Sequence, residues 1–126
     1  MRHSLNEETP IFNQICQMIE DEIIRGHLPE GEQAPSTNQL AAFYRINPAT
    51  VMKGINLLVD EEILYKKRGI GMFVAEGAKR RLMDKRKTLF YQDKVTALLE
   101  EADKLGISSE EIINMIKGEV SNARNE

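Results

Sequence analysis

Two short predicted helices, separated by only a few residues, constrain the fold of this chain more than any other feature. The first begins at "STNQ", where Ser36 and Gln39 match a capping box, and it should run over about residues 37–43. The second begins at Asn47-Pro48, because asparagine caps helices well and proline at the first helical position needs no amide donor. Two helices joined by so short a turn are typical of a helix-turn-helix.

A longer amphipathic helix is predicted before this pair. Thr9 is expected to cap it and Pro10 to occupy its first turn, with Gly26 at its end. Apolar residues recur at helical spacing between these points. Cys16 lies within this helix and has no partner at metal-ligand spacing, so we expect it in the core.

A β-hairpin is predicted after the pair, in "ILYKKRGIGMFV". Its strands should lie near residues 63–67 and 72–75, with a basic tip at residues 68–71. Helix, helix-turn-helix and hairpin, in this order, predict a winged helix-turn-helix domain over residues 1–77.

Residues 78–126 are predicted to form a two-helix tail, in which Gly106 ends one helix and a second capping box, Ser108 with Glu111, begins the next. Two short amphipathic helices can bury both of their apolar faces within one chain only if they pack against the first domain. The alternative is that the apolar faces form a dimer interface, and this is what we expect. The residues predicted to form it are Tyr91, Val95, Leu98, Leu99, Ala102, Leu105, Ile112, Ile113, Ile116 and Val120. The fold class is therefore mainly α with a small β-hairpin: a winged helix-turn-helix plus a C-terminal helical hairpin.

Charge is distributed unevenly along the chain. The net charge is −3, but residues 78–96 hold 7 Lys/Arg against 2 Asp/Glu, a local net of +5. This basic stretch is either a solvated helix face or a surface near phosphates, and both readings stay open.

Composition argues against several classes of protein. No apolar run is long enough to cross a membrane, the N-terminus has no apolar signal-peptide core, and Cys16 is the only cysteine. We therefore expect a cytoplasmic protein without membrane or disulfide. His3 and His27 lie near no acid or nucleophile motif, and no phosphate, dinucleotide or metal fingerprint is present. We expect no enzyme activity, cofactor or metal site.

The helix after Asn47 has one face suited to a DNA groove. Val51, Ile55 and Leu58 share a face and should pack inside. The opposite face carries Ala49, Met52, Lys53 and Asn56, at about 100° per residue. In a major groove, Ala49 and Met52 would contact thymine methyls and Lys53 a guanine or a phosphate, whereas Met52 is otherwise a chance surface residue.

The ordered motifs of this region resemble the GntR family of transcriptional regulators over about residues 10–74. The leader "L-x-x-G-x-x-x-P-S" is matched at residues 28–36, "L-A" at 40–41, "T-V" at 50–51 and the wing "G-x-G-x-F-V" at 69–74. The resemblance implies DNA-contact roles for Ser36, Thr50, Gly69 and Gly71. Asn38, Pro48 and Met52 stand where family members tend to carry arginine, so the contacts of those arginines do not transfer.

The short tail resembles the YtrA-like subgroup, which implies dimerisation through the tail and, by association, repression of transporter operons. We therefore predict a sequence-specific regulator that binds an inverted-repeat operator in double-stranded DNA as a homodimer. The alternative is a winged-helix protein-interaction module without specific DNA binding. No residue identifies a small-molecule effector. The predicted DNA-contact residues are Ser36, Thr37, Asn38, Arg45, Asn47, Ala49, Thr50, Met52, Lys53, Lys66, Lys67, Arg68, Gly69 and Gly71.

Overall fold

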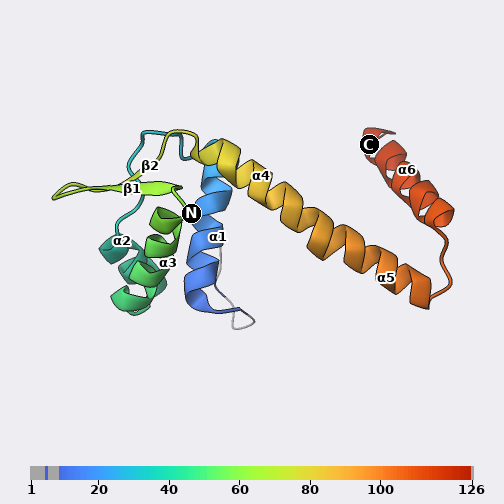
Figure 1. Cartoon of the computed structure of the whole chain (residues 1–126), viewed down its shortest axis with the longest axis horizontal. Helices are drawn as coiled ribbons and strands as arrows, with labels where there is room; N and C mark the ends of the chain where they lie inside the picture. The colour runs from blue at the N-terminus through green and yellow to red at the C-terminus, as the bar shows by residue number, and fades with distance from the viewer. Residues whose placement is uncertain (1–4, 6–8, 126) are drawn as a thin grey trace. The chain divides into compact units, whose positions relative to one another are not determined.

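The computed structural model describes residue 5 and residues 9–125, with side chains up to residue 119 in the last helix. The chain forms two compact units, with the boundary between Asp84 and Lys85. The elements of the first unit are α1 (Ile11–Ile24), α2 (Thr37–Tyr44), α3 (Pro48–Asp60), β1 (Leu64–Lys67), β2 (Gly71–Val74) and the start of α4 (Ala78–Phe90). The second unit holds the rest of α4, η1 (Tyr91–Val95), α5 (Thr96–Lys104) and α6 (Ser109–Asn125). The predicted fold class is confirmed (Figure 1).

The helix-turn-helix is capped as the sequence predicts. The backbone amide of Gln39 donates to Ser36 Oγ at 3.0 Å, and the backbone amide of Ser36 donates to the side-chain oxygen Oε1 of Gln39 at 2.9 Å. Arg45 then adopts a left-handed conformation with φ 55°, which ends α2. Asn47 Oδ1 accepts from the Ala49 amide at 2.8 Å and begins α3 at Pro48.

The predicted start of α1 is wrong by one residue. Pro10 is the N-cap rather than a helical residue, because its ψ of 138° is extended, and no side chain caps this end. The Pro10 carbonyl accepts from the amides of Asn13 and Gln14. The Gln14 side chain donates to the Thr9 carbonyl at 2.7 Å, so Thr9 contributes its backbone and not the predicted hydroxyl cap.

The hairpin is antiparallel, with Leu64 opposite Val74 and Lys67 opposite Gly71, in agreement with the predicted strands to within a residue. The loop before α2 adds an edge that was not predicted. Here the Gly31 amide donates to the Val74 carbonyl and the Ala34 amide to the Met72 carbonyl, both at 2.8 Å. The wing is thus bound to backbone on both sides of β2.

The core of the first unit lies between α1, α2, α3 and the hairpin. Val51, Ile55 and Leu58 are buried on the inner face of α3, as predicted. Ala78 and Leu82 from the beginning of α4 join this core. The sequence boundary after residue 77 stays a prediction, although the first turns of α4 pack with the unit before them.

Arg81 and Tyr44 tie helices of this unit together. The Arg81 Nη2 atom donates to the carbonyls of Glu62 and Glu76, at the end of α3 and before α4. The Tyr44 hydroxyl donates to Met18 Sδ at 2.7 Å, which links α2 to α1. Burial, and then the negative charge of Glu22, raise the pKa of Tyr44 above its ordinary 10.0, so the phenol remains a donor at neutral pH.

The helices α1 and α3 approach each other closely at Gly54. A Cβ atom there would lie 2.7 Å from the Phe12 carbonyl oxygen. Cys16 Sγ donates to the Gly54 carbonyl at 3.0 Å, and Cys16 is buried as predicted. A residue without a side chain at position 54 is therefore needed for this packing.

The tail contains a π-helical turn that was not predicted. Residues Tyr91–Val95 form η1 between α4 and α5, and the Thr96 hydroxyl donates to the Tyr91 carbonyl at 3.2 Å. A π turn has a wider hydrogen-bond spacing and shifts the side chains that follow around the helix. The predicted turn is confirmed, since Gly106 has φ +70° and Ser108 Oγ accepts from the Glu111 amide.

Most apolar side chains predicted for the dimer interface are uncovered in the single chain. Val95 is half-buried, whereas Ala102 and Ile112 are buried within the chain, and the Val120 side chain lies outside the described residues. Leu89, Phe90 and Met115 are also exposed. The exposed predicted residues are Tyr91, Leu98, Leu99, Leu105, Ile113 and Ile116.

No helix in the described part of the chain is both long and apolar enough to span a bilayer.

Gly54→Ala should lower the free energy of unfolding by about 1–3 kcal/mol, because the new methyl group forces two backbones apart. Gly118→Ala is the matched control, since Gly118 lies in α6 with nothing within 4 Å of an added Cβ. It should raise stability by about 0.5–1 kcal/mol. Urea unfolding at one protein concentration measures both, and a neutral Gly54→Ala would contradict the packing.

Candidate nucleic-acid interface

The face of α3 opposite the core is exposed. Ala49, Met52, Lys53 and Asn56 all lie on it, as predicted from helical spacing. The Met52 side chain is 42% exposed, so its thioether is accessible to a partner. This face is uncharged apart from Lys53, so it offers apolar contacts more than ionic ones.

Lys53 is held against α1. Its Nζ atom lies 4.1 Å from the centroid of the Phe12 ring. Such a cation–π contact contributes about 0.5–1 kcal/mol at an exposed site. Phe12 therefore sets the resting position of the one cation on this face, a role that sequence reasoning missed because residues 12 and 53 are distant along the chain.

The start of α2 lies beside the exposed face of α3. The Thr37 hydroxyl donates to Met52 Sδ at 4.0 Å, which places the predicted residue Thr37 next to Met52, with Ser36 and Asn38 as its chain neighbours. Helix N-termini present backbone amides that suit phosphate oxygens. Thr50 is half-buried, and Arg45 is exposed in the turn between the helices.

Asn47 has one role fixed by the fold. Its Oδ1 atom caps α3 through the Ala49 amide, so the amide nitrogen of the side chain is the group that remains for a phosphate or a base edge. Any contact of Asn47 with DNA would therefore be a hydrogen bond that its side-chain nitrogen donates.

The wing carries exposed cations on an aromatic support. Lys66, Lys67 and Arg68 are all exposed. Lys67 Nζ lies 4.2 Å from the Phe73 ring centroid, and the rings of Tyr65 and Phe73 stack across the hairpin with centroids 5.9 Å apart. The aromatic pair therefore orients Lys67. The period of two along a β-strand places Tyr65 and Lys67 on one face, and the register of the hairpin adds Phe73 opposite Tyr65. The sequence signal that could have found this cluster was the alternation within the predicted strand.

The tip of the wing extends away from the body of the first unit (Figure 1). Gly69 and Gly71 both have positive φ, 78° and 145°, so both predicted glycines serve the turn. At Gly71 an added Cβ would lie 2.5 Å from Gln33 Nε2. Gln33 was not predicted as a site residue.

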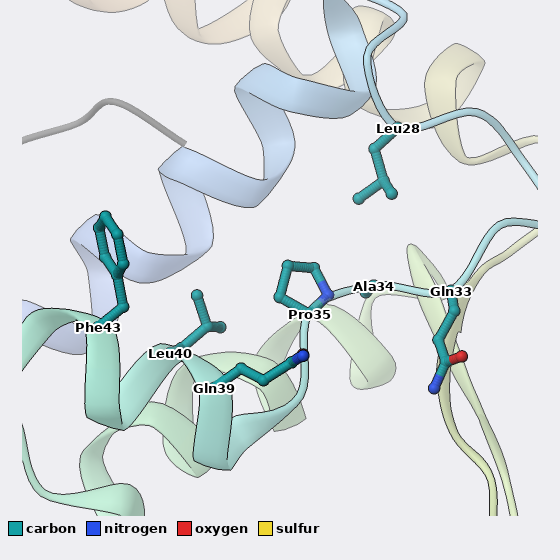
Figure 2. Close-up of a pocket in the computed structure, with 7 residues that line it drawn as sticks. All are labelled: Leu28, Gln33, Ala34, Pro35, Gln39, Leu40 and Phe43. Carbon is teal, nitrogen blue, oxygen red and sulfur yellow. The ribbon is translucent and has the colours of Figure 1, made fainter.

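A shallow depression of about 560 Å³ lies between the loop before α2 and α2 itself (Figure 2). All of its lining residues are uncharged, with Gln33 at the end nearest the hairpin and Phe43 at the opposite end. It was not predicted from the sequence. The lining residues are Leu28, Gln33, Ala34, Pro35, Gln39, Leu40 and Phe43.

The described residues contain no candidate metal site. No group of three or more His, Cys, Asp or Glu side chains there is arranged to hold a metal ion. His27 is exposed and lies 3.1 Å from Glu22, as expected of a surface residue. His3 lies outside the described residues.

The helix-turn-helix followed by an antiparallel wing places the first unit among winged helix-turn-helix domains. The sequence profile "Bacterial regulatory proteins, gntR family" matches residues 12–74. The chain is also 31% identical over 109 residues to the HTH-type transcriptional repressor YtrA of Bacillus subtilis, with 86% of this chain and 83% of YtrA covered. The chain therefore belongs to the GntR family, as a transcriptional regulator with a DNA-binding domain rather than an enzyme.

Solved structures agree with this assignment. A GntR-family regulator from Bacteroides thetaiotaomicron is 35% identical, with a TM-score of 0.75 over 90% of this chain and 98% of that one. The AraR(DBD) structure in complex with operator ORX1 is 29% identical, with a TM-score of 0.52 over 60% of this chain and 92% of that one. The resemblance noted from the motifs, including the YtrA-like type, is confirmed.

Two substitutions at Asn47 separate the cap from the predicted DNA contact. Asn47→Asp keeps an oxygen for the Ala49 amide, so its stability should stay within about 0.5 kcal/mol of the wild type, whereas Asn47→Ala should be destabilised by about 1 kcal/mol. The carboxylate of Asn47→Asp would repel phosphate and should weaken DNA binding by about fivefold or more. Thermal unfolding and fluorescence anisotropy with an operator duplex measure the two effects. Unchanged DNA affinity for Asn47→Asp would remove Asn47 from the interface.

Proposed function

We propose that this chain is a homodimeric, sequence-specific repressor that binds an inverted-repeat operator. The observation that carries the proposal is the coexistence of two exposed surfaces. One is the DNA-facing set on α2, α3 and the wing, and the other is the apolar surface of the tail. The first suits a duplex, and the second suits another copy of the chain.

The dimer part of the proposal rests on apolar side chains whose exposure to water is unfavourable. Leu105 is 64% exposed and Ile116 is 53% exposed, and both belong to a unit that buries only Ala102 and Ile112 among its described apolar residues. Contiguous exposed apolar surface marks an interaction site. A second copy is the occupant we propose, because most soluble oligomers are symmetric dimers. In that arrangement Ala102 and Ile112 support the interface from beneath.

The operator part follows from two-fold symmetry. A symmetric dimer would place two α3 helices about 34 Å apart, which suits half-sites one turn of the duplex apart. Ala49 and Met52 would contact thymine methyls, while Lys53, the wing cations and the N-termini of α2 and α3 would contact phosphate or guanine. Residues 36–75 hold 5 Lys/Arg against 3 Asp/Glu, so the salt dependence should be shallow.

The sign and target of regulation are proposed by similarity. YtrA of Bacillus subtilis is named a transcriptional repressor and is similar over most of both chains. The similarity to the YtrA-like subgroup suggests that the regulated genes encode a transporter. The protein would act in the cytoplasm, where the DNA is. No effector is assigned to the depression beside α2.

Operator selection from a random duplex pool, followed by a salt series, tests this function. An inverted repeat whose binding weakens with salt is the expected result. The alternative, an interaction module without specific DNA binding, is favoured by the single cation on α3. Enrichment of no motif at all would support that alternative and overturn the repressor.

The wing cations should set the salt dependence. The double variant Lys67→Ala, Arg68→Ala should reduce the slope of log affinity against log salt concentration by about 2. Each phosphate that is no longer neutralised accounts for about 1. Lys104→Ala with Lys117→Ala, two exposed lysines of the tail, is the charge-matched control and should leave the slope unchanged. Filter binding at several salt concentrations measures the slope, and equal slopes in the two double variants would exclude the wing from the interface.

The tail should set the oligomeric state. Leu99→Glu with Ile116→Glu would place charges in the proposed dimer interface, so sedimentation equilibrium should show monomers where the wild type is a dimer. Operator affinity should fall by about tenfold or more, because the two DNA-binding units are no longer linked. Glu100→Lys, also on an exposed position of α5, is the control and should remain dimeric. A monomeric wild type at micromolar concentration would contradict the proposal.

A further inference from the structure

An apolar side chain occupies the tip of the basic wing. Ile70 is 64% exposed, and it lies just after the run Lys66, Lys67 and Arg68. A branched apolar residue gains nothing from water at the end of a hairpin. Ile70 is therefore available for an apolar contact with a partner, and the neighbouring cations favour an anionic one.

This tip has a defined conformation, because it is bonded both within the hairpin and from outside it. The Ile70 amide donates to the Lys67 carbonyl at 2.9 Å, which closes the turn. Gln33 Nε2 donates to the Ile70 carbonyl at 3.0 Å, from the loop before α2. Gly71 leaves the space that this amide occupies, since an added Cβ would lie 2.5 Å from Gln33 Nε2.

Gln33 is itself fixed by the sheet edge. Its backbone forms a bridge with Phe73, and the next residue, Ala34, donates to the Met72 carbonyl at 2.8 Å. The side chain thus extends from a backbone already bonded to β2 and reaches the tip. Gln33 is therefore placed to determine where Ile70 projects.

We propose that Gln33 positions Ile70 to enter the minor groove beside each half-site and to select A·T over G·C pairs there. The inference rests on the proposed operator binding and adds a specificity determinant to it. A G·C pair presents the guanine N2 amino group in the minor groove, whereas an A·T pair presents only acceptors. An apolar side chain cannot satisfy that amino group, so its burial against G·C is disfavoured.

The surroundings of Ile70 support the minor groove over a protein partner. A·T-rich minor grooves are narrow and strongly negative, which attracts cations such as those on this wing. Apolar side chains that enter minor grooves are a recurring means of DNA recognition. Ile70 beside Lys67 and Arg68 combines both features on one turn.

The test uses duplexes that change one groove at a time. In the selected operator, each A·T pair flanking the half-sites is replaced by G·C or by inosine–cytosine. The inosine–cytosine pair lacks the guanine N2 amino group, so its minor groove resembles A·T while its major groove resembles G·C. Wild-type protein should bind about fivefold more weakly when G·C stands at the wing positions and should bind inosine–cytosine as well as A·T.

Two variants and a matched control assign this discrimination to named residues. Gln33→Met keeps the side-chain length and charge but removes the donor to Ile70, and Ile70→Ala removes the apolar contact. Both should reduce the preference at the wing positions to nearly none, while discrimination at the α3 positions is unchanged. Gln17→Met, at an exposed position of α1, should preserve both preferences. Thermal unfolding verifies that each variant is folded.

The outcomes separate this inference from the function on which it rests. If wild-type protein selects no operator, the proposed function fails first. If it selects one but treats inosine–cytosine like G·C, the wing positions are read in the major groove and the inference is wrong. A Gln33→Met variant that keeps the wild-type preference, while Ile70→Ala abolishes it, would overturn the positioning role of Gln33.

Discussion

The close contact of α1 with α3 at Gly54 is the constraint on which the proposed DNA-binding surface depends. The missing side chain lets the Phe12 carbonyl and the Cys16 thiol approach the backbone of α3. That approach fixes the rotation of α3, with Val51, Ile55 and Leu58 inside and Met52 outside. It also brings the Phe12 ring to Lys53, so the same contact that packs the core orients the one cation on the exposed face of α3.

The low charge of α3 is compatible with the proposed DNA binding, because other elements of the first unit could supply polar contacts. Asn47 and Ser36 cap two helices whose N-termini lie near the exposed face of α3. The wing supplies Lys67, which its aromatic pair holds in place. Specificity would then come from apolar contacts to thymine methyls and from groove shape, and less from arginine contacts to guanine.

Local sequence signals predicted much of the first unit. The capping box at Ser36, the Asn47-Pro48 start and the glycine-containing wing are short-range features whose hydrogen bonds form between neighbours, so the structure confirms them. The predicted start of α1 was wrong because proline suits both the N-cap and the first helical position. The sequence does not distinguish the two, whereas the extended ψ of Pro10 in the structure makes it the N-cap. The π turn at Tyr91–Val95 was missed because apolar spacing alone does not distinguish one inserted residue from a regular helix.

The sequence by itself determined the order of the elements, the caps of α2 and α3 and the faces of α3, because these depend on residues within a few positions of one another. It also determined the family, through motifs at fixed spacing. Only the tertiary structure placed Gln33 against Ile70 and Phe12 against Lys53, since each pair joins segments about 40 residues apart. It likewise showed that Ala102 and Ile112 are buried while Leu105 and Ile116 are not, because burial depends on which surfaces the folded chain covers.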